Sequence, residues 1–281
     1  MTVTRRWVYA SLVPLAAVLA GMGPLAAVVG DVPFVPTPMV VVDEMLRVAD
    51  VGPQDVVYDL GSGDGRIVIT AAAKFGARGV GVELNPTLVA QSGEAARHMG
   101  VADRVKFVQQ DLFKTGLAEA TVITMYLLPA VNRRLRPQLL ALKPGTRIVA
   151  HDFDLGEWKP DQVTTIRKNV FLWIVPAPVA GRWRAQVPLA GGTRQYEIDF
   201  RQTFQMVDGI ARLDGQPAQM WEVRLRGDRL SFVIVDSEDR DDEASLYFEG
   251  RVTGKTIEGE IKRGVGNAQT TIRWQAARVS P

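Results

Sequence analysis

Short apolar runs alternate with segments of helical length between Asp55 and Ala150. This alternation is typical of a parallel sheet whose strands are joined by crossover helices. The apolar runs predict strands at 56–60, 79–84, 105–109, 121–126 and 147–151. The intervening segments predict helices at 66–75, 87–99 and 130–142. A glycine or proline follows each helix closely, as expected at a helix end, so the pattern predicts a doubly wound α/β domain.

A further helix is predicted upstream of the first strand. Thr37 and Pro38 precede an apolar segment, Val40 to Ala49, that has the features of a capped amphipathic helix. We expect this helix to pack against the first strand and to help cover a ligand.

The pattern changes after about residue 180, where polar and apolar positions alternate one by one, as in Met220 to Leu225. Turn signals such as Asp208-Gly209 and Asp214-Gly215 divide this region. The region predicts about eight antiparallel strands in a barrel or a sandwich. The chain is thus expected to have three parts, at 1–30, 31–178 and 179–281.

Composition narrows the function classes. The 281 residues are 47% hydrophobic, which predicts a globular protein with enough apolar side chains for two cores. Lys and Arg total 33 against 31 Asp and Glu, with no long basic run, so nucleic acid is not an expected partner. Cysteine is absent and His98 and His151 are the two histidines, so no metal site is expected.

The strongest chemical signal is the strand and turn from Val56 to Gly65, in which an acidic residue is followed by three closely spaced glycines. Such glycines let the backbone approach a ligand closely. A dinucleotide fingerprint needs its third glycine one position after Gly65, where this chain has Arg66. The spacing therefore favours S-adenosylmethionine over NAD.

Carboxylates end three successive predicted strands. Asp59 can attract the ammonium group of the methionine moiety, and Glu83, about 20 residues past the turn, can accept from both ribose hydroxyls. Asp111 can accept from the adenine amino group while Leu112 or Phe113 packs on the ring. The predicted cofactor-binding residues are Asp59, Gly61, Ser62, Gly63, Asp64, Glu83, Leu84, Asp111 and Leu112.

Residues 33 to 161 resemble a class I methyltransferase, and closely resemble the mitochondrial lysine methyltransferases of the ATP synthase c-subunit and the adenine nucleotide translocase. The resemblance lies in Asp59 to Ile69, in Phe34 to Pro38 and in Glu83 to Pro86. It implies methylation of a lysine in a membrane-associated protein. The chain departs from many amino methyltransferases at Met125 to Pro129, which lacks a Pro-Pro-aromatic motif, and the β domain has no counterpart in the mitochondrial enzymes.

Methyl transfer to a lysine requires a deprotonated amine, which desolvation and a nearby carboxylate or phenol can assist. Tyr126, His151 and Asp152 end the fourth and fifth predicted strands, where ligands bind in open sheets. We take Tyr126 and Asp152 as the catalytic candidates. The alternatives are a small-molecule methyltransferase, with the β domain as a lid or a dimer contact, and an inactive methyltransferase-fold binding module in the cell envelope.

The N-terminus carries a separate signal. Arg5 and Arg6 precede an uncharged run from Trp7 to Gly30, about the length of a membrane-spanning helix. The run predicts an uncleaved membrane anchor or a signal peptide cleaved near Gly30, in which case the rest is exported. The positive-inside rule would place the domains across the membrane from the arginines, away from a cytosolic cofactor. A helix lying on the membrane, with the domains on the cytoplasmic side, is the third interpretation.

Overall fold

The computed structural model describes residues 34–189, 192–235, 245–263 and 270–280, and Phe34–Pro281 forms one compact unit. The predicted N-terminal anchor or signal lies outside the described residues. Among the helices that the structure describes, none is both long and apolar enough to cross a bilayer.

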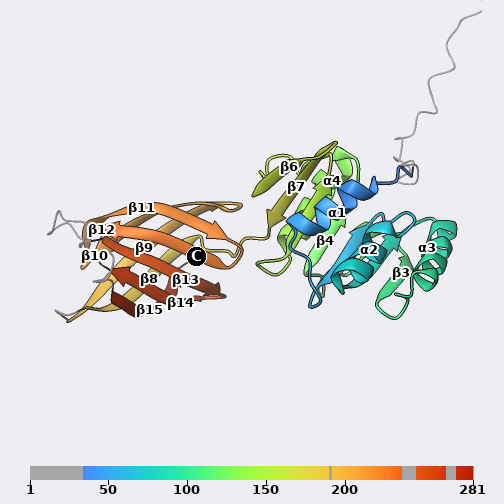
Figure 1. Cartoon of the computed structure of the whole chain (residues 1–281). Coiled ribbons are helices and arrows are strands. Elements are labelled where there is room, and N and C mark those ends of the chain that lie inside the picture. The colour runs from blue at the N-terminus through green and yellow to red at the C-terminus, as the bar shows by residue number, and fades with distance from the viewer. Residues whose placement is uncertain (1–33, 190–191, 236–244, 264–269, 281) are drawn as a thin grey trace, which may run out of the picture. The chain divides into compact units, whose positions relative to one another are not determined.

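A seven-stranded mixed sheet forms the first part of this unit (Figure 1). Its strands are β1 (Val56–Leu60), β2 (Arg78–Glu83), β3 (Val105–Gln109), β4 (Val122–Met125), β5 (Arg147–His151), β6 (Gln162–Thr165) and β7 (Asn169–Ile174). Their order is β3-β2-β1-β4-β5-β7-β6, with β1 to β5 parallel and the last two strands antiparallel. The five predicted strands are confirmed to within one residue at each end, whereas β6 and β7 were not predicted.

Helices cover both faces of the sheet. They are α1 (Met39–Val48), α2 (Arg66–Phe75), α3 (Pro86–His98) and α4 (Pro129–Leu140). Buried side chains of α1 and α2 pack with Val57 and Val149 on one face. Leu135 and Leu139 of α4 pack with Ile123 on the other face, which confirms the doubly wound arrangement.

Local sequence determines where α3 begins. Asn85 follows β2 closely, and its side-chain oxygen accepts hydrogen bonds from the backbone N–H of Thr87 and Leu88. Pro86 occupies the first helical position, where its missing N–H has no cost. The chain therefore turns sharply at the carboxyl end of β2 and leaves Glu83 at the sheet edge.

The second part is a closed barrel of eight antiparallel strands, which decides between the predicted barrel and sandwich. Its strands are β8 (Gly181–Leu189), β9 (Gly192–Thr203), β10 (Met206–Leu213), β11 (Gln216–Arg226), β12 (Arg229–Val235), β13 (Ser245–Thr253), β14 (Thr256–Arg263) and β15 (Thr270–Ser280). The alternating apolar side chains point inward, and large aromatic rings fill the interior. Phe232 stacks on Phe248 with ring centroids 4.6 Å apart, and Trp274 meets both rings edge-on.

Candidate active site

The glycine turn lies between β1 and α2 at the carboxyl edge of the sheet. Gly63 and Gly65 have φ angles of 54° and 77°, in the left-handed region that favours glycine. A Cβ atom on Gly65 would lie 2.7 Å from the ring of Phe107 and 2.9 Å from the Cβ of Ser92, so this position has no room for a side chain. The turn therefore requires glycine at these two positions, and its contact with a ligand stays a prediction.

Asp59 is the penultimate residue of β1 and is almost fully buried. Its Oδ1 accepts a hydrogen bond of 2.8 Å from the hydroxyl of Thr124 on the neighbouring strand β4. Burial raises the pKa of Asp59 to about 7; the Thr124 hydrogen bond opposes this rise, and the nearby carboxylates of Asp64 and Glu83 add to it. A buried carboxylate with this pKa favours a cationic partner, and the ammonium group of S-adenosylmethionine is one.

Two other predicted residues of the turn have different surroundings. Ser62 is buried, and its hydroxyl oxygen has no hydrogen-bond partner among the described residues. Asp64 instead pairs with the guanidinium of Arg66, whose Nε lies 2.9 Å from Oδ1. Burial disfavours the charge on Asp64, but these hydrogen bonds hold the pKa of its carboxyl below the ordinary value. Arg66, which the sequence prediction did not include, therefore fixes the turn.

Glu83 lies one strand away from the glycine turn. Its Oε2 accepts from the backbone N–H of Gly63 at 3.0 Å, and its Oε1 accepts from those of Leu84 and Asn85 at 2.8 and 2.9 Å. One carboxylate therefore connects the turn to the end of β2. Leu84 is 46% exposed and adjoins this carboxylate at the edge where the ribose is predicted to bind.

Asp111 and Leu112 follow β3. The Asp111 side chain accepts from the backbone N–H of Phe113 and caps a short 3-10 helix, Leu112–Lys114. Leu112 and Phe113 are partly buried against the core of that face, and the Arg134 guanidinium lies 3.8 Å from the Phe113 ring centroid. Asp59, Glu83 and Asp111 thus lie within two residues of the carboxyl ends of neighbouring parallel strands. Their roles toward the cofactor stay predictions.

The segment before α1 crosses the same edge. A Cβ on Gly63 would lie 2.2 Å from the Phe34 ring, which shows that this half-exposed ring lies directly over the turn. The backbone carbonyl of Thr37 accepts from Arg66 at 2.9 Å. Phe34 and Thr37 belong to the motif at residues 34–38, but their contacts bring together residues far apart in the sequence. They partly cover the predicted cofactor site.

Tyr126 and His151 meet at the ends of β4 and β5. Their ring centroids are 4.0 Å apart, and the Thr37 hydroxyl lies 3.3 Å from Nδ1 of His151. His151 is buried, and its Nε2 has no hydrogen-bond partner among the described residues. Burial lowers the pKa of His151. The negative charge of Asp152 opposes this lowering of the pKa, and the positive charge of Lys168 adds to it. The imidazole is therefore neutral at pH 7.

Asp152 follows His151 with a φ of 65°. Its carboxylate forms an ion pair with Lys168, with Nζ 3.0 Å from Oδ2. Among Tyr126, His151 and Asp152, His151 is the residue with a buried polar side-chain atom that has no hydrogen-bond partner among the described residues. The sequence alone does not reveal this feature. In the described ranges, no group of three or more His, Cys, Asp or Glu side chains is arranged to hold a metal ion.

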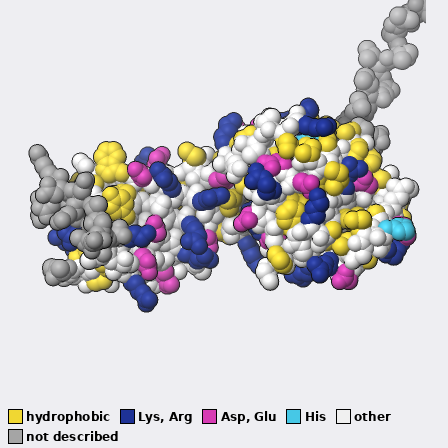
Figure 2. All heavy atoms as spheres, in the orientation of Figure 1, with side chains coloured by type: hydrophobic (Ala, Val, Ile, Leu, Met, Phe, Trp, Pro, Cys, Tyr) yellow, Lys and Arg dark blue, Asp and Glu magenta, His cyan; other side chains and the backbone are white. Residues whose placement is uncertain are grey.

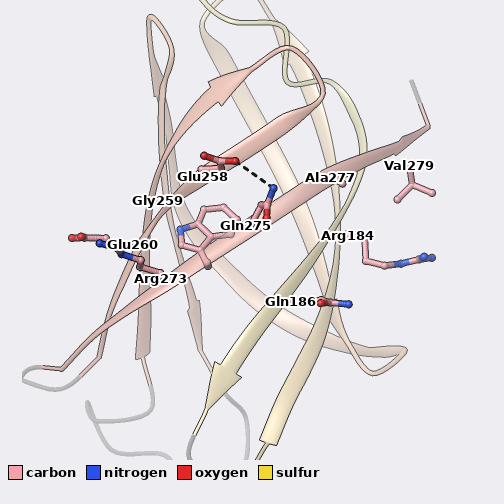
Figure 3. Close-up of a pocket in the computed structure, with 10 residues that line it drawn as sticks. Arg184, Gln186, Glu258, Gly259, Glu260, Arg273, Gln275, Ala277 and Val279 are labelled. Atoms are coloured by element: carbon pink, nitrogen blue, oxygen red, sulfur yellow. Dashed lines mark hydrogen bonds between the residues drawn. The ribbon is translucent and has the colours of Figure 1, made fainter.

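A hollow of about 930 Å³ lies elsewhere, over β8, β14 and β15 of the barrel (Figure 3). Its lining is mainly polar and charged, and Gln275 donates a hydrogen bond of 3.3 Å to Glu258 within it. None of the predicted site residues lines this hollow. It therefore has no part in the site at the glycine turn.

Comparison with known proteins agrees with this geometry. Residues 59–162 match the ANTKMT methyltransferase domain. A protein-lysine N-methyltransferase from Saccharolobus islandicus is 43% identical over 154 residues, which are 52% of this chain and 96% of that protein. A Mus musculus enzyme, named as the lysine N-methyltransferase of the ATP synthase c-subunit, is 40% identical over 47% of this chain, which spans about half (53%) of the mouse protein.

A solved structure shares both sequence and fold. It is described as an RNA methyltransferase from Salinibacter ruber in complex with S-adenosyl-L-homocysteine, is 54% identical, and has a TM-score of 0.51. The match covers 52% of this chain and 96% of that one. The sequence-based resemblance and the predicted cofactor, S-adenosylmethionine, are confirmed by these relatives. The chain belongs to the family of the ANTKMT methyltransferase domain, and its α/β part is an S-adenosylmethionine-dependent methyltransferase.

Proposed function

We propose that this methyltransferase acts on the side-chain amine of a protein lysine. The observation that carries the proposal is the contact between the half-buried Tyr126 and the buried His151, on the same sheet edge as the glycine turn and Glu83. The names of the Saccharolobus and mouse relatives support the same acceptor. A small molecule remains the alternative acceptor that the sequence left open.

When bound, S-adenosylmethionine would supply a methyl group whose carbon an in-line nucleophile attacks, with the sulfonium sulfur leaving as the neutral thioether of S-adenosylhomocysteine. The protein's part is to orient the acceptor and to exclude water. A lysine reacts as the neutral amine, so its ammonium must first lose a proton. Desolvation in the site favours loss of that proton, Nε2 of the neutral His151 can accept a hydrogen bond from the lysine nitrogen, and the aromatic ring of Tyr126 can contact the lysine side chain.

Two other candidates have less support. RNA is named for the Salinibacter structure, but this chain carries a formal net charge of +2, and Figure 2 shows acidic and basic side chains intermixed on the visible face. The second candidate is an inactive binding module with a methyltransferase fold, which would have no reason to keep the residues of a cofactor site. Asp59, Gly63, Glu83 and Asp111 are nevertheless all present at their expected positions.

The test offers labelled S-adenosylmethionine to the purified full chain with three acceptors. They are a lysine-containing membrane-protein fraction, the same fraction with its lysines chemically acetylated, and total RNA. We expect label in the first sample as methyl-lysine, identified by mass spectrometry, with at least tenfold less in the acetylated sample. Label in RNA, or equal label in the acetylated fraction, would contradict a lysine acceptor.

We also propose that residues 7–30 associate the enzyme with a membrane. The support is the uncharged run itself. Membrane sedimentation of the full chain, compared with residues 31–281, tests the proposal, and an equal soluble fraction of both would contradict it.

A further inference from the structure

The turn between β9 and β10 of the barrel has an unfavourable conformation. It consists of Phe204 and Gln205, and Phe204 has a φ of 55°. Two-residue hairpin turns with positive φ favour Asn or Gly, and a bulky residue there is disfavoured because its Cβ crowds the backbone. A strained residue of this kind persists where surrounding contacts over-determine it. The contacts of this turn therefore indicate its role.

Both residues of the turn hold one tryptophan outside the barrel. The Phe204 ring stacks on that of Trp158, with centroids 6.0 Å apart and planes 17° apart. The Trp158 indole N–H donates to the side-chain oxygen of Gln205 at 3.0 Å, and the Gln205 side-chain nitrogen donates to the carbonyl of Lys159 at 2.7 Å. Trp158 is fully buried, and its own carbonyl accepts from the indole of Trp173 at 2.8 Å. The turn and β7 thus fix Trp158 from two sides.

Trp158 belongs to a loop, residues 152–159, that leads away from the acceptor side. The Asn132 side chain donates to the carbonyl of Phe153 at 3.0 Å, which ties the start of this loop to α4. The Phe153 ring stacks with Tyr126, with centroids 6.3 Å apart and planes 15° apart. Arg136 of α4 donates to the carbonyl of Leu155 at 3.1 Å. A continuous set of contacts therefore joins the barrel turn to Tyr126.

We propose that the β9–β10 turn is a positioning element for the methyltransferase, in which Phe204 and Gln205 hold the loop 152–159 and through it shape the acceptor side of the site. The barrel then contributes to acceptor affinity without touching the cofactor. The identity of the acceptor rests on the proposed function, but the positioning of the loop does not.

The test replaces Phe204 with glycine, which removes the ring and relieves the positive φ. The matched control is Asp214→Gly, which also removes a side chain at positive φ, 49°, in the turn at the other end of β10. We expect Phe204→Gly to raise the KM for the acceptor at least fivefold while the Kd for S-adenosylmethionine changes less than twofold. We also expect faster amide hydrogen exchange in 152–159. Gln205→Ala should shift both quantities in the same direction, and Asp214→Gly should shift neither.

Other results would overturn the proposal. Unchanged exchange in 152–159 in both turn variants would show that the turn does not hold the loop. An equal loss of cofactor affinity would indicate general loosening of the domain in place of positioning. If the intact enzyme methylates no lysine, the proposed function fails, and the exchange measurement alone still decides whether the turn positions the loop.

Discussion

Replacing Asp59 with asparagine is expected to stabilise the ligand-free protein at pH 8 and to abolish cofactor binding. In the folded protein the pKa of Asp59 is raised to about 7 from an ordinary 3.8, so the folded state binds its proton more tightly than the unfolded state. This contribution to stability is present below pH 4 and is lost as the pH rises toward and past 7. Asparagine has no charge to bury, and its side-chain oxygen can still accept from Thr124.

The stability effect can be measured by urea unfolding at pH 5 and pH 8. We expect Asp59→Asn to gain roughly 2–4 kcal/mol over the wild type at pH 8 and clearly less at pH 5. Asp103→Asn, on an exposed loop, is the control and should change stability little at either pH. A variant less stable than the wild type at pH 8 would contradict a buried charge at this position.

The same carboxylate gives cofactor binding a pH dependence. An ammonium partner requires the ionised form of Asp59, so the affinity of the wild type for S-adenosylmethionine should increase from pH 6 to pH 8. Binding at pH 6.5 should also release protons, which calorimetry in buffers of different ionisation enthalpy detects. Asp59→Asn should show no binding in the same titration. Tight binding by the variant would exclude Asp59 as the partner of the ammonium group.

Replacing Glu83 with alanine is expected to weaken cofactor binding by about 100-fold or more. Hydrogen bonds to a charged group contribute about 1.5–3 kcal/mol each, and 1.4 kcal/mol corresponds to a factor of ten. The loss has two origins, because the carboxylate is predicted to bind the ribose and also accepts from the backbone N–H of Gly63 and Asn85. Equilibrium dialysis with labelled S-adenosylmethionine measures the change.

Gln109 provides the matched control for Glu83. It is the parallel partner of Glu83 on β3, and its side chain donates to the carbonyl of Leu84 at 3.3 Å. Gln109→Ala removes a polar side chain at the same edge but no carboxylate, and should alter the affinity less than fivefold. Similar losses in both variants would show that the edge as a whole, and not the Glu83 carboxylate, determines binding.

Local pattern was sufficient to predict most of the α/β part. Strands β1 to β5 are short apolar runs that end at polar or glycine residues, and the helices between them begin and end at residues with known preferences. Strand β6 was missed because three of its four residues are exposed, so it lacks an apolar signature. Strand β7 is apolar, but it follows β5 by an antiparallel connection that the expected repeat of strands and helices does not contain.

The carboxylates of the site were predictable, whereas their partners were not. Asp59 and Glu83 stand next to recognisable turns in the sequence, but Thr124 lies 65 residues from Asp59. The Thr37 and His151 contact spans 114 residues and depends on the packing of α1 across the sheet edge. Barrel closure depends similarly on the pairing of β8 with β15, since alternating polarity is the same in a sandwich.

The most direct test of the cofactor site is a calorimetric titration of the full chain with S-adenosyl-L-homocysteine at pH 8. We expect saturable binding with one molecule per chain, lost in both Asp59→Asn and Glu83→Ala although the two variants remain folded. No binding by the wild type, or equal binding by the wild type and both variants, would contradict a cofactor site at the glycine turn.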